Sequence, residues 1–233
     1  MEVWLAVQHP SDTGSLSLPE QFSLAYAPGE SLDPITCADG MQQVVASLLC
    51  EGLFRLGPDF EPEPWLCKSY TYDPVSYTYV FTLYHGITFS DGSFLTSADV
   101  KATLDRARSS ERYGARLSDV TGITAGSETV TVTLAGPNTG FPALLDIPIV
   151  KDGTWERPVG TGPYLFSAED SGDWLIANQS WWRGAKQPLD RIALVEASDQ
   201  DTLLYRFSSH DVQLMTADLT GTTPISATDN VTY

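Results

Sequence analysis

Basic residues are scarce in this chain of 233 residues. It has 13 Lys and Arg residues against 30 Asp and Glu residues, which gives a formal net charge of −17 and a pI near 4.3. A surface this acidic repels phosphate groups, which argues against binding nucleic acid or an anionic membrane through the body of the protein. The apolar runs are also far shorter than the roughly 20 residues that a membrane-spanning helix needs. Met1 and Glu2 open into an amphipathic stretch without a basic segment, so no signal peptide is expected here.

Cysteine and histidine are equally sparse. The three cysteines, Cys37, Cys50 and Cys67, cannot all pair within one chain, and no Cys-x-x-Cys spacing occurs. We therefore expect free, structural thiols, and neither a zinc site nor a redox motif. The three histidines lie far apart, and none has a second histidine at helical or strand spacing. No metal site is expected from such a distribution.

Motifs of catalysis and nucleotide binding are absent from the sequence. There is no nucleophile elbow, no Ser-x-x-Lys and no metalloprotease helix, so we expect no catalytic residues, no cofactor and no enzyme activity. Gly160-Thr161-Gly162 superficially suggests a phosphate loop. However, Pro163 and Tyr164 follow it, where nucleotide binding needs a Lys-Ser/Thr pair or the start of a helix. We interpret this segment as a tight structural turn.

The clearest local pattern lies between residues 77 and 108. Apolar and polar residues alternate from Tyr77 to Tyr84, which predicts a strand, and Asp91-Gly92 suits a tight turn. Thr96 followed by Asp99 suits a capping box at the start of a helix. Apolar residues at helical spacing predict another helix over residues 41–49, and Ser198 with Asp201 suits the cap of a third.

In order and spacing, the segment 77–100 resembles the corresponding segment of the family 5 extracellular solute-binding proteins, the peptide and nickel receptors of bacterial ABC importers. Further motifs similar to those of this family occur in the same order along residues 22–215. They are Leu32-Asp33-Pro34, Glu51-Gly52-Leu53, Pro64-Trp65-Leu66, Gly160-Thr161-Gly162-Pro163-Tyr164 and Trp181-Trp182-Arg183-Gly184. Tyr84, His210 and Gln213 depart from the family pattern, which weakens inferences about the ligand and leaves the fold assignment intact.

The resemblance implies a mixed α/β (α+β) fold, with a periplasmic-binding-protein-like first lobe and an inserted hairpin-rich α+β subdomain. The pattern breaks at Gly52 and again near Pro158. We therefore expect residues 1–50 to form the first part of the lobe, 51–156 the inserted subdomain and 157–233 the second part of the lobe. The family's receptors continue into a second lobe, so the chain is expected to be part of a receptor about twice as long.

The function implied by the resemblance is that of the substrate-binding component of an ABC importer. Such a protein captures oligopeptides or a similar small solute outside the membrane, as a lipoprotein or a periplasmic protein. Its expected partners are the ligand and the ABC permease subunits, with no nucleic acid, and it is expected to be a monomer. A nickel chelate remains an alternative ligand.

Four residues are candidates for ligand binding through the resemblance. Ala38, Asp39 and Gly40 correspond to the family stretch that contacts the peptide backbone, and Asp39 could also hold a ligand's ammonium group. Tyr113 occupies the place of a ligand-facing tyrosine. The alternatives are a helix cap for Asp39 and an ordinary surface aromatic for Tyr113. For the pair Trp181-Trp182 we favour a structural role, because large aromatics mainly supply buried area.

A second class of function stays open at this point. The chain could be the ligand-sensing domain of a cytoplasmic transcription regulator that carries a family 5 solute-binding domain behind a DNA-binding head. Free cysteines permit this interpretation, although the chain has no basic recognition helix. The sequence that precedes Met1 in the gene would distinguish the two, because a lipobox indicates a receptor and a helix-turn-helix indicates a regulator.

Overall fold

The structure is a computed structural model that describes residues 4–8, 21–38, 40–217 and 231–232. Its larger sheet has seven strands in the order β13-β1-β12-β2-β11-β10-β9. These strands are β1 (Trp4–Gln8), β2 (Ser23–Tyr26), β9 (Tyr164–Glu169), β10 (Gly172–Ala177), β11 (Arg191–Glu196), β12 (Leu214–Ala217) and β13 (Val231–Thr232). β2 pairs in parallel with both β11 and β12, and the other pairs are antiparallel.

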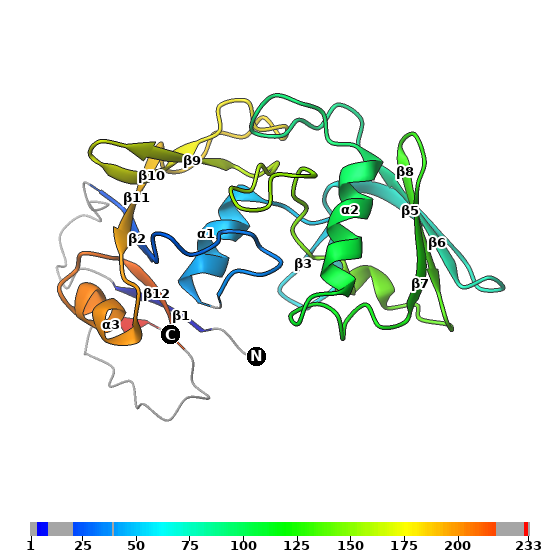
Figure 1. The fold of residues 1–233 in the computed structure, drawn as a ribbon, viewed down its shortest axis with the longest axis horizontal. Coiled ribbons are helices and arrows are strands. Elements are labelled where there is room, and N and C mark those ends of the chain that lie inside the picture. Colours follow the sequence, from blue (N-terminus) through cyan, green and yellow to red (C-terminus); the bar gives the residue numbers. More distant parts are fainter. Residues whose placement is uncertain (1–3, 9–20, 39, 218–230, 233) are drawn as a thin grey trace.

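A second sheet lies at the opposite end of the molecule (Figure 1), with four antiparallel strands in the order β5-β6-β8-β7. Its strands are β5 (Cys67–Asp73), β6 (Thr78–Leu83), β7 (Val120–Ala125) and β8 (Thr129–Leu134). The remaining elements are a two-stranded sheet and four helical segments. They are β3 (Phe54–Leu56), β4 (Pro62–Pro64), α1 (Met41–Leu49), α2 (Ser97–Arg108), the 3₁₀ segment η1 (Phe141–Leu144) and α3 (Gln200–Ser208). α1 packs on β2 and β9, whereas α2 packs on β7 and β8.

Most of the predicted local elements are confirmed. The alternating segment forms β6, whose side chains are alternately half-buried and buried. Thr96 and Asp99 make the reciprocal capping box at the start of α2. The predicted cap of α3 is wrong, because Asp199 is the N-cap and its carboxylate accepts the N–H of Thr202 over 2.7 Å.

The buried side chains form two separate clusters, one under each of the large sheets. Apart from Ile35, which belongs to the cluster of the four-stranded sheet, the chain passes from one cluster to the other between Cys50 and Leu53 and returns between Ile149 and Val150. The strands β2 and β6 also lie in different sheets. The division into 1–50, 51–156 and 157–233 stays a prediction, with these two crossings close to its boundaries.

The first crossing is fixed by the carboxylate of Glu51, which is only 8% exposed. The indole Nε1 groups of Trp65 and Trp181 donate to its Oε1 over 2.8 and 3.2 Å. The indole of Trp182 and the hydroxyl of Thr161 donate to Oε2 over 2.7 and 2.8 Å. Burial raises the pKa of the Glu51 carboxyl, and the four donors act in the opposite direction. The cluster therefore ties together four segments that are distant in the sequence.

Two glycines beside this cluster let the chain approach the end of α1. A Cβ atom on Gly160 would lie 2.1 Å from the carbonyl oxygen of Leu49, and one on Gly162 would lie 2.4 Å from that of Leu48. The Gly162 N–H donates to the Leu49 carbonyl over 2.9 Å and so satisfies one of the free carbonyls at the helix end. Gly160-Thr161-Gly162 is thus a packing turn, as the sequence predicts.

We expect Glu51→Ala to lower the free energy of unfolding by about 3 kcal/mol or more, because it leaves buried indole and hydroxyl donors without an acceptor. Glu51→Gln should cost clearly less, since the amide keeps one acceptor oxygen and removes the cost of burying a charge. Urea unfolding followed by tryptophan fluorescence measures both. The exposed Glu128→Ala is the control and should change the free energy by less than about 0.5 kcal/mol. Equal losses for the Ala and Gln variants would contradict this account.

Candidate functional site

A pocket of about 290 Å³ opens at the carboxyl ends of the parallel strands β2, β11 and β12. In open α/β sheets this edge is where ligands bind, because the loops that follow parallel strands converge there. One wall is the loop after β2, including Ala38 and Gly40, together with the first residues of α1. The other wall is residues 197–200, between β11 and α3. Two helices therefore start at the rim of the same pocket.

The loop after β2 is held by the buried side-chain amide of Gln42. Its Oε1 accepts the N–H of Ala27 over 2.9 Å, and its Nε2 lies 3.4 Å from the carbonyl oxygens of Ala27 and Ser31. Gly40 has a φ of +83°, and a Cβ there would lie 2.9 Å from the Thr216 hydroxyl on β12. A glycine suits this position because other residues rarely adopt a positive φ.

The charges at the two helix starts differ. α1 has no side-chain hydrogen bond at its N-cap, Gly40. At the start of α3 the carboxylate of Asp199 accepts both the N–H and the hydroxyl of Thr202, and these bonds lower its pKa. The pocket therefore combines an ionised carboxylate with a helix N-terminus, whose dipole favours negative charge.

The structure brings two of the four predicted site residues together. Ala38 and Gly40 line the pocket, and Asp39 between them lies outside the described residues. Gln42, Asp199 and Thr216 also line it and were not predicted. Of these, Gln42 could have been noticed in the sequence, because it is a polar residue beside the apolar positions of a predicted helix.

Tyr113 lies elsewhere, in the cluster under the four-stranded sheet. Its side chain is 7% exposed, so the alternative of an ordinary surface aromatic is wrong. Burial raises the pKa of its hydroxyl to about 12. Its segment does touch the loop of Ala38, because Nη2 of Arg112 donates to the Cys37 carbonyl over 2.7 Å. A ligand contact by Tyr113 stays a prediction.

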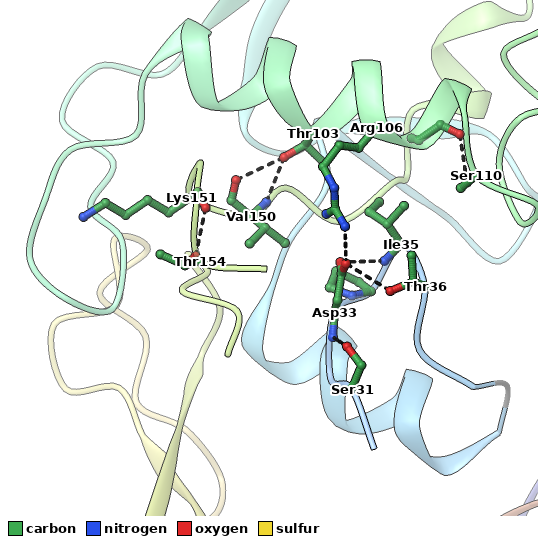
Figure 2. Close-up of polar contacts among 12 residues, drawn as sticks. Ser31, Asp33, Ile35, Thr36, Thr103, Arg106, Ser110, Val150, Lys151 and Thr154 are labelled. Carbon is green, nitrogen blue, oxygen red and sulfur yellow. Dashed lines mark hydrogen bonds and ion pairs between the residues drawn. The ribbon is translucent and has the colours of Figure 1, made fainter. Parts of the chain in front are cut away.

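The loop that leads to this pocket is anchored on α2 by Asp33 (Figure 2). The Asp33 carboxylate accepts the N–H of Ile35 and the hydroxyl of Thr36, each over 3.1 Å, and Nη2 of Arg106 over 2.6 Å. Asp33 is 2% exposed, and the Arg106 guanidinium also stacks on Trp155 at 4.0 Å from its ring centroid. This ion pair connects the loop after β2 to the helix of the other sheet.

In the described part of the chain, no side chains are grouped as a metal site, and the cysteine thiols are buried. No group of three or more His, Cys, Asp or Glu side chains that could hold a metal ion occurs there. Cys37, Cys50 and Cys67 are free and buried, and burial raises the pKa of the Cys37 and Cys67 thiols to about 11. Among the described residues, no helix is both long and apolar enough to cross a membrane.

We expect Arg106→Ala to reduce the free energy of unfolding by about 3 kcal/mol, because it leaves the buried carboxylate of Asp33 without its cation. Lys101→Ala on the same helix removes only a partly exposed ion pair to Asp105. It should cost less than about 0.5 kcal/mol. Denaturant unfolding of the two variants decides the matter, and similar losses would show that the Asp33–Arg106 pair is not an anchor.

Comparison with known proteins connects this geometry to a family. The sequence model described as "Bacterial extracellular solute-binding proteins, family 5 Middle" matches residues 61–233. The glutathione-binding protein GsiB of Salmonella typhimurium is 30% identical over 189 residues, which cover 74% of this chain and 37% of the relative. GsiB of Escherichia coli K12 matches with the same identity and coverage. The chain thus spans well under half the length of these relatives.

Solved structures share the fold. MoaA of A. tumefaciens R10, in complex with mannopinic acid, superposes with a TM-score of 0.69 at 22% identity, over 82% of this chain and 44% of that protein. NikZ of Campylobacter jejuni, in complex with Ni(L-His), has a TM-score of 0.65 at 19% identity, over 82% of this chain and 42% of that protein. The mixed α/β architecture is therefore that of periplasmic-binding-protein-like receptors. Since the family's sequence model covers most of its length, this chain belongs to the bacterial extracellular solute-binding proteins, family 5.

Proposed function

We propose that this chain provides one wall of the ligand cleft in the substrate-binding component of an ABC importer. The observation that carries the proposal is the pocket at the carboxyl ends of β2, β11 and β12. It is lined by Ala38 and Gly40, two of the residues that the family resemblance selects as ligand contacts. The protein would act outside the membrane without catalysis, anchored as a lipoprotein or free in the periplasm, and would deliver its solute to the permease subunits.

The ligand class we propose is an oligopeptide or a similar small polar solute. Glutathione, named for the GsiB relatives, is itself a short peptide. The ionised carboxylate of Asp199 suits a ligand's ammonium group, and the start of α1 suits its carboxylate. A nickel–histidine complex, as in NikZ, is the alternative ligand.

Capture by such a protein depends on closure around the ligand. This chain corresponds to less than half of its relatives, so we assign the opposing wall of the cleft to the part that it does not cover. A ligand that contacts both walls favours the closed form by its differential affinity for that form. Specificity would then come from polar groups on both walls, with the start of α1 and Asp199 as the contribution of this chain.

The first test places a bulky side chain in the pocket. Ala38 is exposed on the loop and lines the pocket, so Ala38→Trp should block it with little effect on folding. In the longer receptor that contains these residues, we expect Kd for glutathione or short peptides to rise at least about tenfold, or about 1.4 kcal/mol. Isothermal titration calorimetry measures this. Ala185→Trp, at an exposed position in the turn between β10 and β11, is the matched control and should bind normally.

This test has two possible negative results, and each leads to a different conclusion. Unchanged binding by the Ala38→Trp receptor would show that the ligand lies elsewhere. No binding of glutathione or any peptide by the unmodified receptor would reject the ligand class.

The chain of 233 residues should bind the same ligands only weakly by itself. A pocket normally buries most of its ligand, and affinity depends on that burial and on polar contacts from all sides. If half the contacts of a micromolar complex are missing, several of its about 8 kcal/mol are lost and Kd becomes millimolar or weaker. Micromolar binding by this chain, measured by calorimetry, would show that it holds a complete site.

A further inference from the structure

A second and larger cavity, of about 1210 Å³, lies beside the first. Its walls are the loop 28–32, the loop 153–159 and the hairpin of β9 and β10. Figure 2 shows Ser31 and Thr154, which belong to the first two of these walls. The two pockets share only Tyr26 and Glu30. The volume is large enough for a ligand of several residues, since small-molecule sites span roughly 300–1,000 Å³.

Local hydrogen bonds fix the two loops that form this cavity. The Ser31 hydroxyl accepts the N–H of Asp33 over 3.0 Å, in the loop that Arg106 anchors. In the other loop, the Thr154 hydroxyl donates to the Lys151 carbonyl over 2.8 Å and accepts the N–H of Val159 over 3.2 Å. A cavity with fixed walls costs less entropy to fill than one that must be ordered by its ligand.

Aromatic side chains form part of the lining, contributed by Tyr26, Trp155 and Phe166. Phe166 is 36% exposed and its ring lies 6.5 Å from that of Tyr26, so part of the ring is available to a ligand. Trp155 already carries a guanidinium on its ring, that of Arg106. That cation–π contact is already made within the chain, so Phe166 is the better candidate for an aromatic contact with a ligand.

The ionisable groups of the lining are mainly acidic, with Glu30, Asp91, Glu156 and Asp173 against Arg157. Asp91 is paired with Lys151, and Asp173 accepts the Tyr26 hydroxyl. Within the described part of the chain, the side chains of Glu30 and Glu156 make no hydrogen bond or ion pair, and both are exposed. These two carboxylates are thus available to a positive group from outside.

We propose that this cavity is a binding site for a cationic solute with an apolar body, with basic peptides as the chemical class. The ammonium or guanidinium group would lie between Glu30 and Glu156, and the apolar part against Phe166. The cavity shares Tyr26 and Glu30 with the pocket of Ala38 and Gly40, whereas Glu156 and Phe166 line the cavity alone. A loss of binding in a Glu156 or Phe166 variant of this chain therefore reports on the cavity, whatever the outcome for the importer.

The test compares two peptides that differ only in charge, acetylated and amidated Lys-Phe-Lys and Gln-Phe-Gln. In calorimetry at low salt, we expect the Lys peptide to bind at least tenfold more tightly, and this preference should shrink in 0.5 M NaCl. The double variant Glu30→Gln/Glu156→Gln should weaken the binding of the Lys peptide at least fivefold. Phe166→Ala should weaken both peptides about threefold.

The matched control removes two other exposed carboxylates, in Asp119→Asn/Glu128→Gln. Both lie on the four-stranded sheet and its loops, away from the cavity. This variant has the same net charge as the cavity variant and should bind the Lys peptide within twofold of the unmodified chain. Equal losses in the two double variants would mean a general attraction to an acidic protein and would overturn the site. Equal binding of the two peptides would overturn it as well.

Discussion

The junction between the two clusters is organised around a single buried carboxylate that accepts four hydrogen bonds. Glu51 follows α1 directly, and its oxygens are shared by three indoles and a hydroxyl from segments up to 131 residues away. An ionised carboxylate has about four acceptor sites and no donor, so only such a group satisfies four converging donors at once. This requirement explains why the tryptophans that contact it are structural and why the crossing between the two clusters has a fixed course.

The hydrogen bonds to Glu51 fix the carboxyl end of α1, and the first residues of α1 form part of the pocket. Gly160 and Gly162 press against the carboxyl end of the helix, while Gln42 at its other end holds the loop after β2. The Asp33–Arg106 pair then fixes the same loop on α2. The edge that holds the pocket of Ala38 and Gly40 is thus positioned by the junction of the two clusters. A change at Glu51 should therefore reach the pocket through α1 without any contact to a ligand.

Local patterns in the sequence were sufficient to predict individual strands and helices. They were less informative about how these elements pair and pack. The capping box of Thr96 and Asp99 and the alternation in β6 depend on neighbouring residues, so both were predictable. The predicted range of α1 is confirmed, and three of its apolar residues, Met41, Val45 and Leu49, are buried as the helical pattern indicates. Gln42 is buried as well, because its amide pairs with backbone groups outside the helix, which a helical pattern does not reveal. The parallel pairing of β2 with β11 joins residues about 170 positions apart, and no spacing rule foresees it.

The acidity of the chain can be interpreted only when the positions of the acidic side chains in the structure are known. From composition, a net charge of −17 argues against phosphate-rich partners and says nothing about where the charge acts. In the structure, two acidic groups near the junction form ion pairs, Asp33 with Arg106 and Asp91 with Lys151. Glu30 and Glu156 line the same cavity as the partly exposed ring of Phe166, and within the described residues neither makes an ion pair. A carboxylate left unpaired in a hollow acts on a ligand more strongly than one on a flat surface, since low-dielectric walls focus its field. The selectivity that we propose for this cavity would therefore follow from a few unpaired charges rather than from the total.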